Sequence, residues 1–443
     1  MNRVVSSHYD AHVPRYTSYP TAPHFHDGID ETVYSDWLKK IDTESAVSLY
    51  FHVPFCTRMC WYCGCHTRVV GRYESVWRYV QVMARELELV AEAISARPLV
   101  THVHWGGGTP TMLSAADFDG LMSDVSRRFR IAENAEIAVE IDPRTLDGNK
   151  IAALADAGVT RASLGIQDLT PEVQRAVNRV QPFKMVADAV TALRDAGITE
   201  INFDLMYGLP FQTADDVVAT IDKVVELAPD RLAVFGYAHV PWMKTHQRMI
   251  NEAELPDGPA RWAQSEVAAE RLVDHGYRRI GLDHFAAACD SLAVADENGQ
   301  LKRNFQGYTT DCAETLLGLG ASAIGSLPEG YVQNVVPIGQ YTEIIESGRL
   351  AVRRGIALTP DDRLRRDVIE RLMCGHVVDL SDLGDGCFTD ELERLAPMAS
   401  DGVVEIDQGR VRVTETGRPL LRSVCAVFDR YLGTGIGRHS RAV

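Results

Sequence analysis

The sequence predicts an α/β fold: a partly open barrel of six strand-then-helix units, preceded by an N-terminal arm and followed by a small, mostly helical, winged-helix-like domain. Six short, nearly continuous apolar runs alternate with longer segments of helical periodicity, the pattern of a parallel sheet wrapped by helices. Polar residues follow the ends of these runs, where parallel barrels place their chemistry. The sequence offers no two further convincing units, so we predict six units rather than a closed barrel of eight.

The length of 443 residues exceeds that of one ordinary core and indicates one large and one small domain. We expect an arm over residues 1–45, the barrel and its extension over residues 46–355, and a C-terminal helical domain over residues 356–443. Prolines at positions 14, 20 and 23 predict an extended arm, which ends in a short helix near residues 33–40.

The barrel units follow in order. The predicted strands cover residues 46–53, 100–105, 136–141, 161–166, 200–206 and 231–237. The predicted helices cover residues 73–96, 115–129, 150–157, a segment from 171, 183–196 and 214–227. The C-terminal domain is predicted to contain helices at 360–373 and 389–399, a Gly/Asp-rich turn at 382–386, strands at 403–405 and 411–413, and a last helix from 416.

Four of the nine cysteines lie within ten residues, directly after the first predicted strand: Cys56, Cys60, Cys63 and Cys65. Structural zinc usually needs two separated ligand pairs, and no second C-x-x-C follows. The C-x-x-x-C-x-x-C spacing supplies three thiolates from one loop, which suffices for three irons of a 4Fe-4S cube and leaves the fourth iron open. We therefore predict Cys56, Cys60 and Cys63 as metal ligands and Cys65 as a spare thiol beside the cluster.

Trp61 and Tyr62 lie between these ligands, where they either shield the cluster or pack in an ordinary core. The other cysteines are scattered, and we expect them to be buried small apolar residues. They are Cys289, Cys312, Cys374, Cys387 and Cys425.

The net charge of −16 disfavours binding to nucleic acid or to anionic membranes, because both need a basic face. Residues 1–10 lack the apolar run of a signal peptide, and no run approaches the roughly 18 apolar residues of a membrane span. We expect a cytoplasmic, monomeric protein without nucleic-acid or membrane partners, whose C-terminal domain is a lid or packing module rather than a DNA-binding one.

Three glycines, Gly106 to Gly108, follow the second predicted strand. They form either a tight turn or a place where the backbone approaches a ligand; the Lys-Ser/Thr of a phosphate loop is missing. Polar residues also end the later strands, which predicts a binding rim. They are Glu140 and Asp142, Gln167 and Asp168, Asp204, and Tyr237 with His239.

The cysteine spacing resembles that of radical S-adenosylmethionine enzymes. Several segments narrow the resemblance to the oxygen-independent coproporphyrinogen III oxidase (coproporphyrinogen dehydrogenase) family: RYTSYPTA at 15–22, HWGGGTPT at 104–111, VEIDPR at 139–144, NFDLMYGLP at 202–210, GLDHFA at 281–286, RNFQGYTT at 303–310 and FDRYL at 428–432. The resemblance covers nearly the whole chain.

The resemblance implies a partial (β/α)6 radical SAM barrel with one 4Fe-4S cluster and two S-adenosyl-L-methionine molecules. It implies that a 5'-deoxyadenosyl radical abstracts a hydrogen from the propionate carbon next to the ring of coproporphyrinogen III. Loss of carbon dioxide and one electron then gives a vinyl group, and two such reactions give protoporphyrinogen IX in haem biosynthesis. The expected partners are this substrate and a low-potential electron donor such as flavodoxin or ferredoxin.

The resemblance also assigns site residues. Around the first S-adenosylmethionine it places Tyr50, Gly107, Glu140 and Ile324, and around the second Tyr62, Gly108, Thr109, Gln167, Arg179, Asp204 and Ala238. From the sequence alone, Arg179 could equally be a solvated surface charge, and each candidate for the substrate pocket named below could equally be a surface or capping residue. Tyr50 and Cys65 are candidates for radical or proton handling. Candidates for the substrate pocket are Arg15, His284, Arg303, Asn304, Gln306 and Tyr308.

Three alternatives stay open at this point. Related haem-binding chaperones share the cluster loop and barrel, but typically lack the extra cysteine and the arm. An anaerobic haem-processing radical enzyme is the second alternative, and a zinc-stabilised barrel without redox chemistry is the third.

Overall fold

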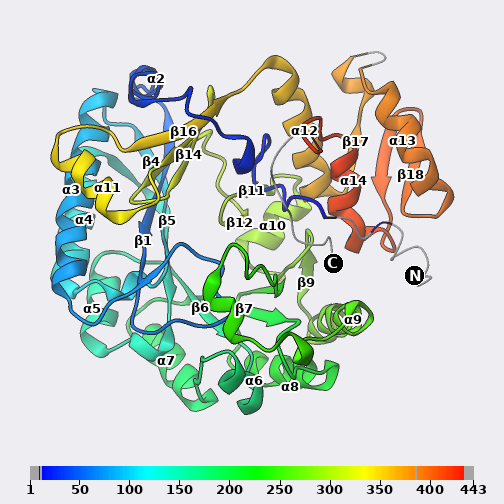
Figure 1. Ribbon diagram of the computed structural model, residues 1–443, viewed down its shortest axis with the longest axis horizontal. Coiled ribbons are helices and arrows are strands. Elements are labelled where there is room, and N and C mark those ends of the chain that lie inside the picture. The colour runs from blue at the N-terminus through cyan, green and yellow to red at the C-terminus, as the bar shows by residue number, and fades with distance from the viewer. Residues whose placement is uncertain (1–8, 10–11, 385–386, 434–443) are drawn as a thin grey trace.

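The computed structural model describes residue 9, residues 12–384 and residues 387–433 of the chain. Within these residues, a twelve-stranded sheet forms the centre of the protein, in the order β16-β15-β14-β13-β1-β4-β5-β6-β7-β8-β10-β9 (Figure 1). The six strands from β1 to β8 in this order pair in parallel. The two end strands, β16 and β9, do not pair with each other. The prediction of a partly open, six-unit barrel is therefore confirmed.

The parallel strands are β1 (Ala46–Val53), β4 (Leu99–Gly107), β5 (Arg130–Ile141), β6 (Arg161–Gln167), β7 (Glu200–Tyr207) and β8 (Arg231–Gly236). The helices that cover them are α3 (Glu74–Ile94), α4 (Ala115–Arg128), α5 (Gly148–Asp156), α6 (Pro171–Ala176), α7 (Phe183–Asp195), α8 (Ala214–Val225) and α9 (Gly258–Asp274). The strand β5 begins six residues before the predicted start, because Arg130 and Ile131 pair with the first residues of β4.

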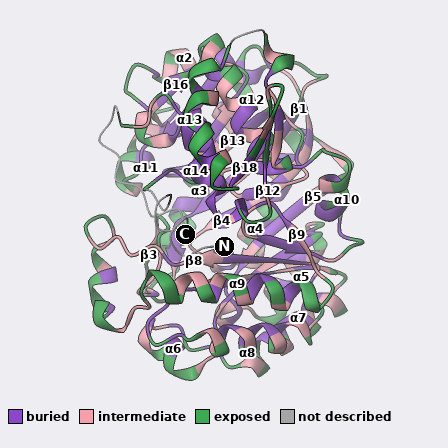
Figure 2. Ribbon diagram, turned by 90° about the vertical axis from the view of Figure 1, so that its right-hand side faces the viewer, coloured by how far each residue is buried: buried purple, intermediate pink, exposed green. Residues whose placement is uncertain are grey.

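Local chemistry fixes several helix starts. The side chain of Thr213 accepts a hydrogen bond from the Asp216 backbone N–H, and the Asp216 carboxylate accepts one from the Thr213 backbone N–H. These two bonds form a capping box at the start of α8. Ser114 and Asp257 accept bonds from the first turns of α4 and α9. Figure 2 shows the outcome: the strands are largely buried, and the helices bury one face and expose the other.

Further strands extend the barrel sheet at both edges, and the sequence did not predict them. On one side β13 (Thr315–Leu319) pairs in parallel with β1, followed by the antiparallel strands β14 (Ile324–Leu327), β15 (Gly330–Asn334) and β16 (Val352–Ala357). On the other side lie β10 (His284–Ala286) and β9 (Arg278–Ile280). Smaller elements are β2 (Phe55–Cys56), β3 (Arg68–Val69), β11 (Lys302–Asn304), β12 (Gly307–Thr309), α10 (Ser291–Glu297) and α11 (Ile338–Glu346). Short 3-10 helices are η2 (Pro110–Met112), η3 (Pro143–Thr145), η4 (Thr245–Met249) and η5 (Glu252–Glu254).

The C-terminal region contains α12 (Pro360–Gly375), β17 (Val377–Asp379), η6 (Ser381–Leu383), α13 (Thr389–Ser400), β18 (Val404–Asp407), β19 (Arg410–Val413), η7 (Arg418–Leu420) and α14 (Leu421–Val427). Its three strands form a separate sheet in the order β17-β19-β18. The strand β17 was not predicted, and the last helix begins at Leu421 rather than at residue 416. Residues 385 and 386 of the predicted turn lie outside the described residues.

The N-terminal arm contains η1 (Ala22–His24) and α2 (Glu31–Leu38). Val13, Tyr16 and Tyr19 of the arm belong to the apolar core of the C-terminal region, and Figure 1 shows the arm running beside α14. The helix α2 instead packs on the barrel core. The arm therefore packs on both the barrel core and the core of the C-terminal region.

The scattered cysteines divide into two groups. Cys374 and Cys425 are buried as predicted, but the prediction is wrong for Cys289, Cys312 and Cys387, which are exposed. These three lie in connecting segments, which run over the surface of a protein. No described helix has the length and apolarity needed to cross a bilayer.

Candidate active site

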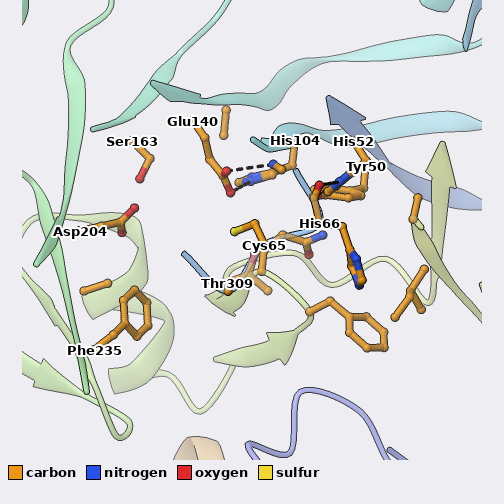
Figure 3. Close-up of a pocket in the computed structure, with 18 of the residues that line it drawn as sticks. Tyr50, His52, Cys65, His66, His104, Glu140, Ser163, Asp204, Phe235 and Thr309 are labelled. Atoms are coloured by element: carbon orange, nitrogen blue, oxygen red, sulfur yellow. Dashed lines mark hydrogen bonds and ion pairs between the residues drawn. The ribbon is translucent and has the colours of Figure 1, made fainter. Parts of the chain in front are cut away.

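A cavity of about 1090 Å³ lies inside the barrel. Each parallel strand turns alternate residues toward it, because successive side chains of a strand point to opposite faces. The inward residues include Tyr50 and His52 of β1, His104 of β4, Glu136, Ala138 and Glu140 of β5, Arg161 and Ser163 of β6, Asn202 and Asp204 of β7, and Ala233 and Phe235 of β8. Figure 3 shows several of these side chains directed into the same space.

Six of the fifteen predicted site residues line this cavity, and the predicted ligands Cys56, Cys60 and Cys63 do not; the six are Tyr50, Cys65, Gly107, Glu140, Asp204 and Ile324. Of the candidates for the substrate pocket, His284, Gln306 and Tyr308 line it as well. The cysteine loop and the segment from His284 to Thr309 therefore both contribute to the cavity lining.

Glu140 is held by two neighbours. Its Oε1 lies 3.3 Å from His104 Nε2, and its Oε2 accepts a hydrogen bond of 3.1 Å from the Gly107 backbone N–H (Figure 3). Asp204 faces the same space from β7, and burial together with the charge of Glu140 raises its pKa to about 7. The cavity thus offers one oriented carboxylate and one carboxyl group that titrates near neutrality.

Tyr50 is oriented by a histidine. Its hydroxyl lies 3.0 Å from His52 Nδ1, while His52 Nε2 lies 3.0 Å from the His66 carbonyl oxygen. Because a carbonyl oxygen only accepts, Nε2 of His52 carries the proton and Nδ1 accepts a hydrogen bond from the Tyr50 hydroxyl. Burial lowers the pKa of His52, which keeps the ring neutral in this arrangement.

The three glycines allow the backbone of the rim to pack closely. A Cβ on Gly106 would lie 2.8 Å from Glu140 Oε1, and one on Gly107, whose φ is +115°, would lie 2.7 Å from the His52 ring. A Cβ on Gly108 would lie 2.6 Å from the Phe55 carbonyl oxygen. Gly107 lines the cavity, whereas Gly108 packs against the start of the cysteine loop.

The cysteine sulfurs are surrounded by hydrogen-bond donors. Cys56 Sγ lies 3.2 Å from Thr67 Oγ1 and 3.4 Å from Thr109 Oγ1. Cys60 Sγ accepts from Arg144 Nη2 at 3.4 Å and from Arg179 Nη1 at 3.6 Å. Donors and cations of this kind stabilise thiolates and negatively charged clusters.

Cys63 and Cys65 form a coupled pair. A hydrogen bond from Cys65 lowers the pKa of Cys63 to about 7, and the same bond raises the pKa of Cys65, whose residue is exposed, well above its usual range. These opposite shifts favour a thiolate at Cys63 and a protonated thiol at Cys65. Within the described residues, no three His, Cys, Asp or Glu side chains converge enough to hold a single metal ion. A cube has no such requirement, because each thiolate binds a different iron.

Arg179 is a buried cation. It is 7% exposed, donates to the Gly165 carbonyl oxygen at 2.6 Å, and pairs with Asp142 at 3.4 Å. The alternative that it is a solvated surface charge is wrong. Its Nε has no hydrogen-bond partner in the described structure, which leaves a buried donor beside the cluster loop.

The other residues assigned to the second S-adenosylmethionine lie around the cysteine loop, outside the main cavity lining. Tyr62 and Trp61 pack on a small core that includes Val173 and Val177, so these aromatic residues do pack in a core. Gln167 has a φ of +69° at the end of β6. The Ala238 carbonyl oxygen accepts from Gln247 at 3.2 Å.

Three candidates for the substrate pocket do not line the cavity. Arg303 stacks on Tyr308, with 4.3 Å between its guanidinium carbon and the ring centroid, and donates to the Arg15 carbonyl oxygen at 3.4 Å. Arg15 is exposed and donates to the Gly236 carbonyl oxygen at 3.4 Å. Asn304 Oδ1 accepts from the Gln306 backbone N–H. These contacts hold the segment around Gln306 in place behind the cavity wall.

The sequence interpretation missed several residues at the site: His52, His66, His104 and Arg144. A signal was present for two of them. His52 lies two residues after Tyr50, and His104 lies two residues before Gly106, each on a predicted strand. A spacing of two places them on the same inward face as residues already assigned. Arg144 follows the end of its strand in a loop, where direction cannot be derived from periodicity.

Comparisons with known proteins agree with this geometry. Residues 50–224 match the family model of the radical SAM superfamily, and residues 358–420 match the model of the HemN C-terminal domain. The oxygen-independent coproporphyrinogen III oxidase of Bradyrhizobium diazoefficiens is 52% identical over 446 residues, which cover 99% of this chain and 98% of that protein. The protein of the same description from Escherichia coli is 40% identical over 426 residues, which cover 95% of this chain and 93% of that protein.

The structure of coproporphyrinogen III oxidase (HemN) from Escherichia coli, described as a radical SAM enzyme, superposes with a TM-score of 0.90 at 40% identity. The match covers 94% of this chain and 98% of that one. It therefore includes the barrel, the edge strands and the C-terminal region together.

Proposed function

Because this chain belongs to the oxygen-independent coproporphyrinogen III oxidase family of radical S-adenosylmethionine enzymes, we propose that it oxidatively decarboxylates two propionate side chains of coproporphyrinogen III to vinyl groups. The product is protoporphyrinogen IX. The observation that carries the proposal is a cavity whose wall contains Tyr50, Glu140 and Asp204 and whose lining includes Gly64, Cys65 and His66 of the cysteine loop.

The residues present fit a 4Fe-4S cluster and S-adenosylmethionine. Threonine hydroxyls at Cys56 and guanidinium groups at Cys60 suit sulfurs that carry negative charge. When bound, these groups supply a carbon radical that removes a hydrogen atom from the propionate carbon next to the ring. Carbon dioxide and one electron then leave the substrate, and the electron passes to an acceptor.

The binding assignments extend this proposal. Tyr50, Gly107, Glu140 and Ile324 hold one S-adenosylmethionine, and Tyr62, Gly108, Thr109, Gln167, Arg179, Asp204 and Ala238 hold a second. Glu140 suits an amino or ribose hydroxyl group because its carboxylate is fixed by His104 and Gly107. Cys56, Cys60 and Cys63 are the cluster ligands.

Tyr50 and Cys65 handle protons or radicals at the cavity wall. His52 Nδ1 receives the hydrogen bond of the Tyr50 hydroxyl, so a proton leaving Tyr50 has an acceptor at 3.0 Å. The thiol of Cys65 keeps its proton, because its hydrogen bond to Cys63 raises its pKa. We further propose a monomeric, cytoplasmic enzyme with an arm at residues 1–45, a barrel region at 46–355 and a C-terminal domain at 356–443. It takes electrons from a low-potential donor such as flavodoxin or ferredoxin and binds neither nucleic acid nor membranes.

The test is turnover under argon. The reconstituted protein receives coproporphyrinogen III, S-adenosylmethionine and a low-potential reductant, and carbon dioxide and protoporphyrinogen IX are measured. Haem binding without turnover, or a colourless zinc protein, would contradict the proposal. Cys60→Ser should abolish both cluster and turnover, whereas Cys65→Ser should keep the cluster absorbance; loss of iron in the second variant would show that the ligands are wrongly assigned.

A further inference from the structure

Arg354 of β16 lines the cavity on the antiparallel extension of the sheet. It stands opposite Gln333 of β15 in the strand register, and its Nε donates to Gln333 Oε1 at 2.7 Å. Gln333 is 5% exposed, and its own Nε2 donates to the Ser322 carbonyl oxygen at 3.2 Å. The hydrogen bond to Ser322 thus orients the side-chain oxygen of Gln333 toward Arg354, and this oxygen holds the guanidinium through Nε.

Arg354 differs from the other arginines of the cavity wall in its charge balance. Arg161 pairs with Glu136, Glu200 and Asp290, and Arg231 pairs with Asp290. Arg354 forms no ion pair with any described carboxylate, and its only side-chain hydrogen bond is the one to neutral Gln333. Two guanidinium nitrogens, Nη1 and Nη2, are therefore free for a ligand.

A half-buried cation without a counterion is unusual in a chain of net charge −16. Burial and neighbouring Arg353 disfavour its charged form and lower its pKa. An anion bound there would relieve this cost. Elsewhere in the cavity wall, Arg161 and Arg231 already pair with carboxylates, and the carboxylate of Glu140 would repel a further one.

We propose that Arg354, held by Gln333, is a carboxylate-binding residue that anchors one propionate of the tetrapyrrole through its Nη1 and Nη2 atoms. The planar guanidinium matches a carboxylate with two parallel hydrogen bonds, which fixes orientation as well as distance. The inference rests on the proposed function, because it names a substrate contact for that reaction.

The place of Arg354 gives the anchor a direction. Ala22 and Pro23 of the arm and Ile324 of β14 line the same cavity. His66 of the cysteine loop lines this cavity too, and burial, with smaller contributions from charges that include Arg354, lowers its pKa to about 4. An anchored propionate at Arg354 therefore lies on the side of the cavity where the cysteine loop faces the arm.

The variants are Arg354→Gln and Arg354→Lys, with Arg353→Gln as matched control. Arg353 is the preceding residue of the same strand, is exposed, and does not line the cavity. Iron content and the formation of 5'-deoxyadenosine from S-adenosylmethionine in the absence of substrate are measured for each reconstituted protein. The KM for coproporphyrinogen III, the KM for S-adenosylmethionine and the Kd for coproporphyrin III by fluorescence titration are then compared.

Arg354→Gln should raise the KM for coproporphyrinogen III and the Kd for coproporphyrin III about 10-fold or more, the usual loss for a hydrogen bond between charged groups. Arg354→Lys should lie between this variant and the wild type, since its point charge cannot form the paired bonds. Iron content, cleavage of S-adenosylmethionine without substrate and the Arg353→Gln values should match the wild type.

Equal porphyrin affinities in Arg354→Gln and Arg353→Gln would overturn the inference while leaving the proposed function intact. A raised KM for S-adenosylmethionine alone would also overturn it, and would assign the guanidinium to the methionine carboxylate of that molecule. Failure of the wild type to turn over coproporphyrinogen III would instead remove the proposed function.

Discussion

Two guanidinium groups approach one sulfur at Cys60. Arg144 lies 3.4 Å from this sulfur and Arg179 lies 3.6 Å from it, and both also pair with Asp142. Their combined effect, with hydrogen bonds from Arg144, holds the pKa of buried Asp142 below its usual range. A positive charge beside a cluster ligand favours the reduced, more negative form of the cluster, because it offsets the added electron.

Arg179→Met should therefore shift the reduction potential of the cluster to more negative values. We expect a shift on the order of 60 mV, the equivalent of a tenfold change in a one-electron equilibrium, because Arg144 remains in place. An anaerobic redox titration followed by electron paramagnetic resonance measures it. Arg175→Met is the control, since Arg175 is exposed on α6; equal potentials in both variants would show that Arg179 does not act on the cluster charge.

Single residues of the site could be predicted where spacing alone determines proximity. The cysteine triad lies in one loop, and Glu140 and Asp204 lie at inward positions near strand ends. Arg303, a candidate for the substrate pocket, stacks on Tyr308 and does not line the cavity, because no periodicity in a three-residue strand fixes the direction of a side chain. Arg354 was missed because its strand, β16, was not predicted.

At the scale of elements, a buried glutamate ties α3 to the edge strands. Glu86 accepts hydrogen bonds from the Gly320 N–H, from Asn334 Nδ2 and from the Tyr341 hydroxyl, each at 2.6 Å. The next loop residues, Ser322 and Ala323, line the cavity. Burial nevertheless raises the pKa of Glu86 from 4.5 to about 7.

This shift predicts a pH dependence of stability. Between about pH 4.5 and 7 the folded chain holds a proton on Glu86 that the unfolded chain has released, so the free energy of unfolding falls as pH rises through this window. Above pH 7 the whole loss of stability due to Glu86 is present. A pKa that is raised from 4.5 to about 7 corresponds to roughly 3 kcal/mol of unfolding free energy. Glu86→Gln should remove this part of the slope, as urea unfolding under argon at pH 5 and pH 7.5 would measure.

Glu86→Gln also points an amide N–H₂ at one of the groups that donate to Glu86. It should therefore lower the free energy of unfolding at pH 5 by about 1–3 kcal/mol. Glu92→Gln, on the exposed side of the same helix, should leave both the stability and the slope unchanged. A wild-type slope that persists in Glu86→Gln would show that other carboxyl groups cause it.

The segment after β8 holds the cysteine loop from outside. Lys244 Nζ donates to the Cys65 carbonyl oxygen at 3.0 Å, His246 Nε2 lies 2.7 Å from that of Cys63, and Gln247 donates to that of Tyr62 at 3.0 Å. Of these, Gln247 is 1% exposed and also accepts from the Val240 N–H. Backbone groups of the cluster loop thus depend on one distant segment.

Gln247→Ala should loosen both segments, because it leaves the Tyr62 carbonyl oxygen and the Val240 N–H without partners, at a cost of about 1–3 kcal/mol. Hydrogen–deuterium exchange should become faster over residues 60–65 and 238–250, and iron should be lost faster in air. The exposed neighbour Arg248 provides the control variant Arg248→Ala. Exchange rates in Gln247→Ala that match the control would contradict the role of this contact.

The six parallel strands could be predicted because each is a buried apolar run followed by a periodic helix. The edge strands β13 to β16 could not, since each has at most six residues and is stabilised by pairing with β1 or with one another across long stretches of sequence. The strand β17 has three residues and depends in the same way on β19. Short strands carry too little periodicity to be recognised without their partners.

At the scale of the whole molecule, the arm and the C-terminal region form one core beside the barrel. Val13, Tyr16 and Tyr19 share that core with residues of α12 and α14, and the Tyr16 hydroxyl donates to Asp429 at 3.1 Å. A few residues further along, Ala22 and Pro23 reach the cavity. The arm therefore connects the C-terminal region with the cavity, and the sequence, which predicted the arm and this region as separate parts, did not reveal this connection.

Arg422 of α14 connects these parts, because its guanidinium donates to the Pro14 carbonyl oxygen at 2.9 Å and also to that of Val13. Arg422→Met should weaken the arm contact by about 1.5–3 kcal/mol, as expected for hydrogen bonds from a charged donor. Limited proteolysis should then cut within residues 12–25 at a faster rate, and the KM for coproporphyrinogen III should rise while iron content stays constant. Arg412→Met, an exposed residue of β19, serves as the control; arm cleavage at the same rate in both variants would show that Arg422 does not hold the arm against the C-terminal region.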